Sequence, residues 1–245
     1  MLFRKVCFQF FFDYSTLKLS KMIRSTIVFI FLFYSFHSNA QMTKLPNQGM
    51  KSHLTLQITK IERTSIQTIL ELTVQNQTLN GWFCADKNII ITNAQGGETY
   101  KILRATGIPI CPDQHQFKKL DETLSFVLYF PAIDPAIKYI NLIENCEDAC
   151  FSFKGVILDE KFNREIDRAF ELYKQKKNTE SVDVFIKLIE TYASYPYGLL
   201  YFSIIKIYHE TGQSDLKKKW IESLKMSTIE DKEFYLDLLK QKNMM

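Results

Sequence analysis

The sequence predicts an α+β protein of two domains, with an antiparallel β-sandwich followed by α-helical hairpins. In residues 52–158 apolar and polar side chains alternate with a period of two, which is typical of strands with one buried face. From residue 159 onward the period becomes that of amphipathic helices. The apolar positions of these helices also recur at a fixed spacing, which indicates stacked helix pairs.

Seven strands are expected in the first domain. Three have the clearest alternation, at residues 54–58, 70–74 and 124–130. Four weaker candidates lie at residues 88–92, 99–105, 138–144 and 151–158, with Gln95-Gly96-Gly97 as a hairpin turn between the first two of these. Because no convincing helix separates the strands, they predict an Ig-like sandwich.

Three helices of the second domain have strong apolar stripes at positions i, i+3, i+4 and i+7, starting from Ile166, Val182 and Tyr201. The third is expected to open at Pro196, where the missing N–H costs nothing, and to close at Gly212. The stripes therefore predict consecutive antiparallel helices.

A fourth helix is expected around Trp220 and a fifth around Tyr235. Ser227 is followed three residues later by Glu230, which matches a capping box. We therefore expect the fifth helix to be capped by Ser227.

The helical region repeats with an offset of 35 residues. The matched apolar pairs are Ile166 with Tyr201, Ala169 with Ile204, Phe170 with Ile205, Tyr173 with Tyr208, Phe185 with Trp220, Ile186 with Ile221, and Ile189 with Leu224. With the motif Tyr208-His-Glu-Thr-Gly212, the last 80 or so residues resemble tetratricopeptide repeats (TPR), whose unit is about 34 residues. The resemblance implies TPR-like hairpins, with the final helix as a cap. Val182 and Lys217 stand where that family has a small residue.

Four runs in the β region form a second recognisable pattern: GIPICP at 107–112, LSFVLYFP at 124–131, INLIE at 140–144 and FSFKGVIL at 151–158. This pattern is similar to a domain of unknown function that is common in exported proteins of Bacteroidetes-type bacteria. The resemblance implies the fold and export, and it supplies no catalytic residue.

Residues 22–41 have the anatomy of a secretory signal peptide. Arg24 precedes an apolar core of about 11 residues, whereas a membrane span needs about 20. Ser38 and Ala40 suit cleavage before Gln41. We expect export to the periplasm, the outer membrane or the medium, and no membrane span after cleavage; an uncleaved anchor is the alternative.

These features predict the organisation of the whole chain. Residues 1–40 are expected to be an N-terminal extension and signal peptide, with Met22 as the true start. A linker at 41–51, the sandwich at 52–158 and the TPR-like domain at 159–245 are expected to follow.

The charge of the chain depends on this cleavage. Five of the 31 basic residues and one of the 27 acidic residues precede residue 41, so the mature chain has 26 of each. A formally neutral chain offers no electrostatic basis for binding nucleic acid or an anionic membrane surface.

Four cysteines remain after cleavage, and an even count in an oxidising compartment favours disulfides. Cys146 and Cys150 flank a short loop between two predicted strands, where opposed residues lie about 4.5–5.5 Å apart, within disulfide reach. Cys84 and Cys111 would then pair by elimination. A zinc site is the alternative.

We expect a non-enzymatic scaffold that binds a protein or peptide through the helices. Tyr195 and Tyr197 flank Pro196 in a loop and are the candidate partner-binding residues. No catalytic, cofactor-binding or metal-binding residue is predicted. The acidic residues Glu144, Glu147 and Asp148 are expected to lie at a solvated hairpin tip.

Two other functions are open at this point. An envelope enzyme would use Cys111 as a nucleophile with His115 as its base. A carbohydrate-binding module would use the loops around Trp82 and Phe83 as its binding platform.

Overall fold

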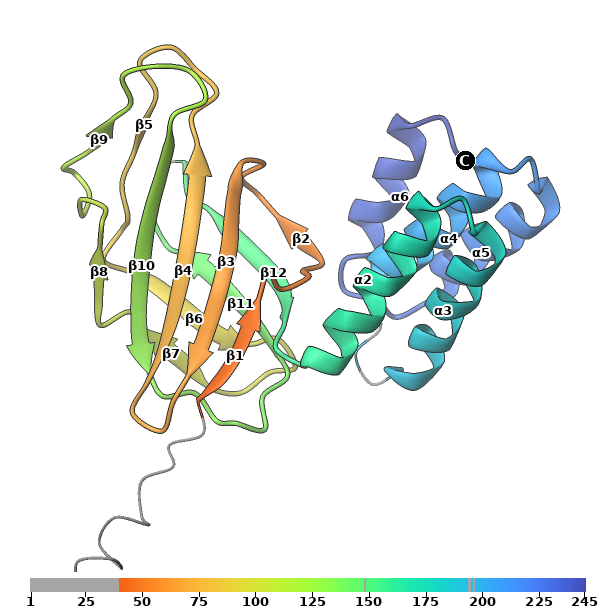
Figure 1. Cartoon of the computed structure of the whole chain (residues 1–245), viewed down its shortest axis with the longest axis horizontal. Coiled ribbons are helices and arrows are strands. Elements are labelled where there is room, and N and C mark those ends of the chain that lie inside the picture. The colour runs from red at the N-terminus through yellow and green to blue at the C-terminus, as the bar shows by residue number, and fades with distance from the viewer. Residues whose placement is uncertain (1–39, 148, 194, 196) are drawn as a thin grey trace, which may run out of the picture. The chain divides into compact units, whose positions relative to one another are not determined.

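The computed structural model describes residues 40–147, 149–193, 195 and 197–245 (Figure 1). The fold is α+β, with antiparallel sheets in the N-terminal part and five helices in the C-terminal part of the described chain. Met22 and the predicted signal peptide up to Asn39 lie outside the described residues, as does Pro196.

Two five-stranded sheets and a two-stranded sheet form the β region (Figure 1). The first sheet has the order β1 (Gln41–Lys44), β3 (Leu56–Arg63), β4 (Gln67–Gln75), β10 (Thr123–Pro131) and β8 (Arg104–Thr106). The second has the order β2 (Met50–Lys51), β12 (Ser152–Ile157), β11 (Tyr139–Glu144), β6 (Ile89–Asn93) and β7 (Thr99–Lys101). Strands β5 (Trp82–Phe83) and β9 (His115–Gln116) form the third.

The inner faces of the two larger sheets share one hydrophobic core. Along β4, Leu70, Leu72 and Val74 are buried while the residues between them are half-exposed, as the alternating pattern predicts. Ile89 and Ile91 of β6 contribute from the other sheet and are completely buried. The period-two pattern therefore marks the core-facing side of each sheet.

Two parts of the β region differ from the sequence-based expectation. The expected strand at 99–105 is two strands, β7 and β8, which belong to different sheets. The expected linker at 41–51 contains β1 and β2, which pair with β3 and β12. These short polar strands exist because neighbouring strands supply hydrogen-bond partners, which a local pattern does not reveal.

The five helices are α2 (Glu160–Lys174), α3 (Asn178–Thr191), α4 (Gly198–Glu210), α5 (Ser214–Met226) and α6 (Lys232–Gln241). The side chain of Asp159 caps α2 by accepting a hydrogen bond from the Phe162 amide at 3.0 Å. Gly212, with φ of 71°, follows the end of α4 in the left-handed conformation that glycine adopts most readily.

The predicted capping role of Ser227 is wrong. Its hydroxyl donates to the Leu224 carbonyl at 2.7 Å, and its amide donates to the same oxygen at 3.1 Å. Ser227 therefore satisfies the C-terminal end of α5, and α6 begins five residues later at Lys232 with Asp231 as its N-cap residue.

Asn163 of α2 joins the helical region to the β region. It is 5% exposed, and its Oδ1 accepts hydrogen bonds from the backbone amide and the side-chain amide of Asn47, at 2.8 and 3.1 Å. Its Nδ2 donates to the Ile157 carbonyl at 2.9 Å. The bond to the Ile157 carbonyl is buried and the two bonds from Asn47 are partly buried, so Asn163 provides hydrogen-bond partners for backbone groups of the β region.

We predict that Asn163→Ala destabilises the fold by about 1–3 kcal/mol, because it leaves buried backbone groups without hydrogen bonds. Chemical denaturation of the wild type and variant measures the change. Arg164→Ala is the matched control, since its side chain is 68% exposed on the same helix. Equal loss in both variants would show that the Asn163 contacts add nothing beyond helix propensity.

Candidate functional site

A cleft of about 940 Å³ opens at one end of the β region. Its walls come from His53, from β5 and the residues after it, from the loop before β9, and from the turn between β11 and β12. We call this site the disulfide cleft, because both disulfide bonds contribute to its lining.

The two disulfides are Cys84–Cys111 and Cys146–Cys150, with Cα–Cα distances of 5.4 and 5.6 Å. These are the pairings expected from the sequence. The first ties β5 to the loop before β9, and the second closes the β11–β12 turn. Both sides of the cleft are therefore covalently restrained.

The disulfides remove the thiol chemistry that the sequence left open. Cys111 is bonded to Cys84 and so has no thiolate to act as a nucleophile or as a zinc ligand. His115 does not line the cleft; its ring packs edge-on against Phe117 at 4.9 Å, and its Nε2 lies 3.8 Å from a Glu122 carboxylate oxygen. The proposed Cys111–His115 pair is therefore not a catalytic arrangement in this structure.

Glu144 holds two walls of the cleft together. One carboxylate oxygen accepts from the Asp86 amide at 2.7 Å and the other from the Phe151 amide at 3.1 Å. The side chain is 6% exposed, and burial raises its pKa although both hydrogen bonds act in the opposite direction. The expectation of a solvated tip is wrong for Glu144 and right for the exposed Glu147, and Asp148 lies outside the described residues.

His53 is one of the residues that line the cleft. Its ring packs edge-on against Phe83 with centroids 5.5 Å apart. Its Nδ1 is buried without a hydrogen-bond partner among the described residues. Burial, together with the nearby charge of Lys51, lowers the pKa of His53, which favours the neutral ring. The cleft thus contains an imidazole whose pKa is lowered and whose Nδ1 has no hydrogen-bond partner among the described residues.

Trp82 and Phe83 follow the alternation of β5 and have opposite environments. Phe83 is 9% exposed and packs into the core, whereas Trp82 is 46% exposed and lines the cleft. Several planar polar side chains share that lining, namely Asp86, Asn88, Gln114, Asn145 and Glu147. An exposed indole and a set of amides and carboxylates therefore face the same space.

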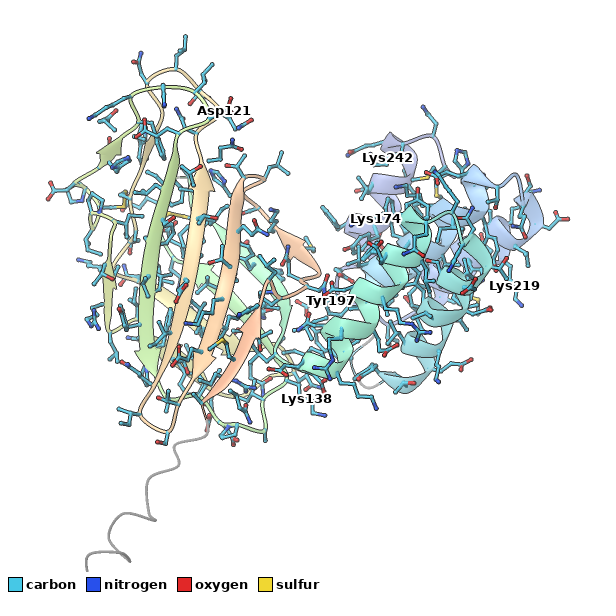
Figure 2. The ribbon with its side chains drawn as sticks, viewed as in Figure 1. Asp121, Lys138, Lys174, Tyr197, Lys219 and Lys242 are labelled. Atoms are coloured by element: carbon cyan, nitrogen blue, oxygen red, sulfur yellow. A yellow bond between two sulfur atoms is a disulfide. The ribbon has the colours of Figure 1, made fainter. Side chains whose placement is uncertain are left out.

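Tyr195 and Tyr197, the residues predicted to bind a partner, lie outside this cleft. Tyr197, labelled in Figure 2, is 2% exposed. Tyr195 is half-buried and stacks on Tyr139 with ring centroids 4.3 Å apart. Both tyrosines line a second, smaller cavity.

No protein-family model matches this chain, and no curated protein or solved structure matches it either. Its class is accordingly defined by its architecture and site: an α+β protein with a cleft bordered by two disulfides. In the described ranges no helix has the length and apolar character of a membrane span. Those ranges also contain no group of three or more His, Cys, Asp or Glu side chains arranged to hold a metal ion.

The two carboxylate contacts of Glu144 lead to a stability prediction. Glu144→Gln replaces one acceptor oxygen by an NH₂ donor, which then faces a backbone N–H, so we expect a loss of about 1–3 kcal/mol. Glu147→Gln is the control on the same rim and should change stability by less than about 0.5 kcal/mol. Thermal unfolding of both variants tests this; equal stabilities would mean that the buried carboxylate does not join the walls.

The two disulfides should differ in their contribution to stability. Cys84–Cys111 closes a separation of 27 residues, for which loop-closure entropy predicts about 3–4 kcal/mol. Cys146–Cys150 closes a separation of 4 residues and should contribute about 2 kcal/mol. Double Cys→Ser variants of each pair, compared by denaturation, measure the order. The reverse order would indicate that loop entropy does not govern their effects.

Proposed function

We propose that this chain is an exported, non-enzymatic binding protein whose disulfide cleft binds carbohydrate. The observation that carries the proposal is the half-exposed indole of Trp82 beside planar polar side chains in one cleft. A sugar ring has an apolar C–H face that packs on an aromatic ring, and its hydroxyl groups pair with amide and carboxylate groups. The cleft offers both kinds of contact.

The size and rigidity of the cleft support this ligand class. Its volume of about 940 Å³ lies near the upper end of the range for small-molecule sites, about 300–1,000 Å³. Disulfides restrain both walls, and Glu144 links them through backbone amides. A pre-formed site loses little conformational entropy on binding, which favours affinity for a polar ligand.

Export is supported by the covalent chemistry of the chain. Disulfides persist in oxidising compartments, and two in one chain indicate an exported environment. The resemblance to exported Bacteroidetes-type domains agrees with this environment and stays a prediction. We propose export to the periplasm, the outer membrane or the medium.

The assignment of the β region to an Ig-like sandwich and of the helices to a TPR-like repeat is also part of the proposal. Two antiparallel sheets around one core support an Ig-like sandwich. For the helices, all fourteen residues of the seven matched pairs are buried or half-buried, which supports a TPR-like repeat.

A second candidate function is the peptide-binding scaffold expected from the repeat. A shallow groove of about 840 Å³ runs along α2 and includes Lys206 of α4. Phe170 and Tyr173 form its apolar part, and four basic residues outnumber two acidic ones in its lining. This composition favours a peptide with acidic side chains.

We predict that Trp82→Ala abolishes or weakens glycan binding at least about tenfold, because it removes the aromatic surface for the sugar. Glycan-array screening followed by calorimetry on the best glycan measures the loss. Phe234→Ala is the control, since Phe234 is an aromatic residue 42% exposed outside the cleft. A blank array, or equal binding by Trp82→Ala, would contradict the carbohydrate proposal.

A peptide-binding experiment distinguishes the second candidate function, the peptide-binding scaffold, from the carbohydrate-binding protein. An acidic-peptide library that binds the wild type and loses affinity with Lys206→Glu, while Trp82→Ala binds normally, would favour the helical groove.

A further inference from the structure

A second cavity, of about 140 Å³, lies where four segments of the chain meet, and it shares no lining residue with the disulfide cleft. The segments are the start of β2, the middle of β12, the α3–α4 connection and the α5–α6 connection. The polar side chains of its lining are those of Tyr195, Tyr197, Thr228, Glu230 and Asp231, with Lys154 as the basic residue.

The hydroxyl of Tyr197 is a buried polar group of this cavity whose hydrogen bonding is not satisfied by the described residues. The side chain is 2% exposed, and its oxygen is buried without a hydrogen-bond partner in the described part of the chain. A buried hydroxyl without a partner is unfavourable, so native proteins normally satisfy it with protein, water or a ligand. This atom therefore needs a partner that the described residues do not supply.

Gly155 keeps the space beside this hydroxyl open. Its φ of 62° lies in the left-handed region, and a Cβ built there would lie 3.1 Å from the hydroxyl oxygens of both Tyr195 and Tyr197. The two hydroxyls thus converge on one position of β12 that carries no side chain. Any larger residue would press against both.

A hydrogen bond from the backbone positions the Asp231 carboxylate in the cavity. An Asp231 carboxylate oxygen accepts from the Gly198 amide at 3.3 Å, and the other oxygen lies next to Gly49, 2.8 Å from where a Cβ would stand. Burial raises the pKa of Asp231 to about 6. Glu230 beside it is exposed, and the lining therefore has two carboxyl side chains and a single lysine.

We propose that this cavity binds a primary alkylammonium group, supplied by a lysine side chain of a partner protein or by a free amine. An ammonium has three N–H donors and no acceptor, which suits the Tyr197 oxygen and the Asp231 carboxylate. Tyrosine ring faces also attract cations. The volume is close to that of a protein cavity that holds benzene, about 150 Å³, so a four-carbon chain fits. An anionic ligand would meet Glu230 and Asp231.

Titration of the ¹⁵N-labelled protein with three probes of equal length tests the charge preference. We expect n-butylammonium to shift the Gly49 and Gly155 amide signals saturably, and 1-butanol and butyrate to bind at least about tenfold more weakly. Gly96 and Gly97 are internal controls, because neither lines the cavity and no atom of the described residues lies within 4 Å of a Cβ built at either position. Equal affinity for butyrate or 1-butanol, or no saturable shift with any probe, would overturn the proposal.

Variants identify the groups responsible. Asp231→Asn should weaken n-butylammonium binding about tenfold while it still accepts from Gly198, and Tyr197→Phe should weaken it several-fold. Tyr197→Phe should unfold no more easily than the wild type, because the lost hydroxyl has no partner among the described residues. Asp237→Asn is the charge-matched control on α6, where Asp237 is 62% exposed. Equal loss in Asp231→Asn and Asp237→Asn would mean that only net charge matters, and unchanged binding by Tyr197→Phe would mean that its hydroxyl is not a ligand group.

The peptide acetyl-Gly-Lys-Gly-amide distinguishes the two sources of the ammonium. Tighter binding than n-butylammonium supports a lysine of a partner protein, and binding of the free amine alone supports a small metabolite amine. The outcome does not depend on the carbohydrate proposal, since Trp82→Ala should leave this binding unchanged.

Discussion

The second sheet is buried on both of its faces at β11 and β12, and the arrangement of the chain depends on this constraint. Ile140 and Val156 point into the core shared by the two sheets, while Tyr139 and Ile157 belong to the core formed with the helices. Successive side chains of a strand point to opposite faces, so adjacent residues serve two different cores. The helices complete a sheet that would otherwise expose apolar surface to water.

The contacts around this doubly buried sheet are polar as well as apolar. Phe162 of α2 stacks on Tyr192 with centroids 3.9 Å apart and meets Tyr139 edge-on. Asn163, the next residue, satisfies backbone groups of the β region. The Tyr235 hydroxyl of α6 donates to the Gly49 carbonyl at 2.6 Å. Hydrogen bonds at such contacts fix the geometry, because unpaired buried groups are costly.

The proposed sites arise at the edges of these cores, where packing leaves space beside polar groups. In the disulfide cleft, Trp82 turns outward because its neighbour Phe83 turns inward. In the smaller cavity, Gly155 leaves room in front of two tyrosine hydroxyls. Neither feature has a motif in the sequence. The isolated glycine within a strand pattern was the one available signal, since it often marks a bulge or a close approach.

Sequence periodicity by itself determined the α+β class, the central strands and the five helices of the described chain, because burial of one face imposes a period on residues that are close together in the chain. The even count of four cysteines after the predicted cleavage site likewise indicated two disulfides. Only the tertiary structure decided the short strands β1, β2, β5 and β9, the burial of Glu144 and Tyr197, and the role of Ser227 at the end of α5. Each of these depends on a hydrogen-bond partner or a packing neighbour, and most of those partners are distant in the chain, where a local pattern carries no record of them.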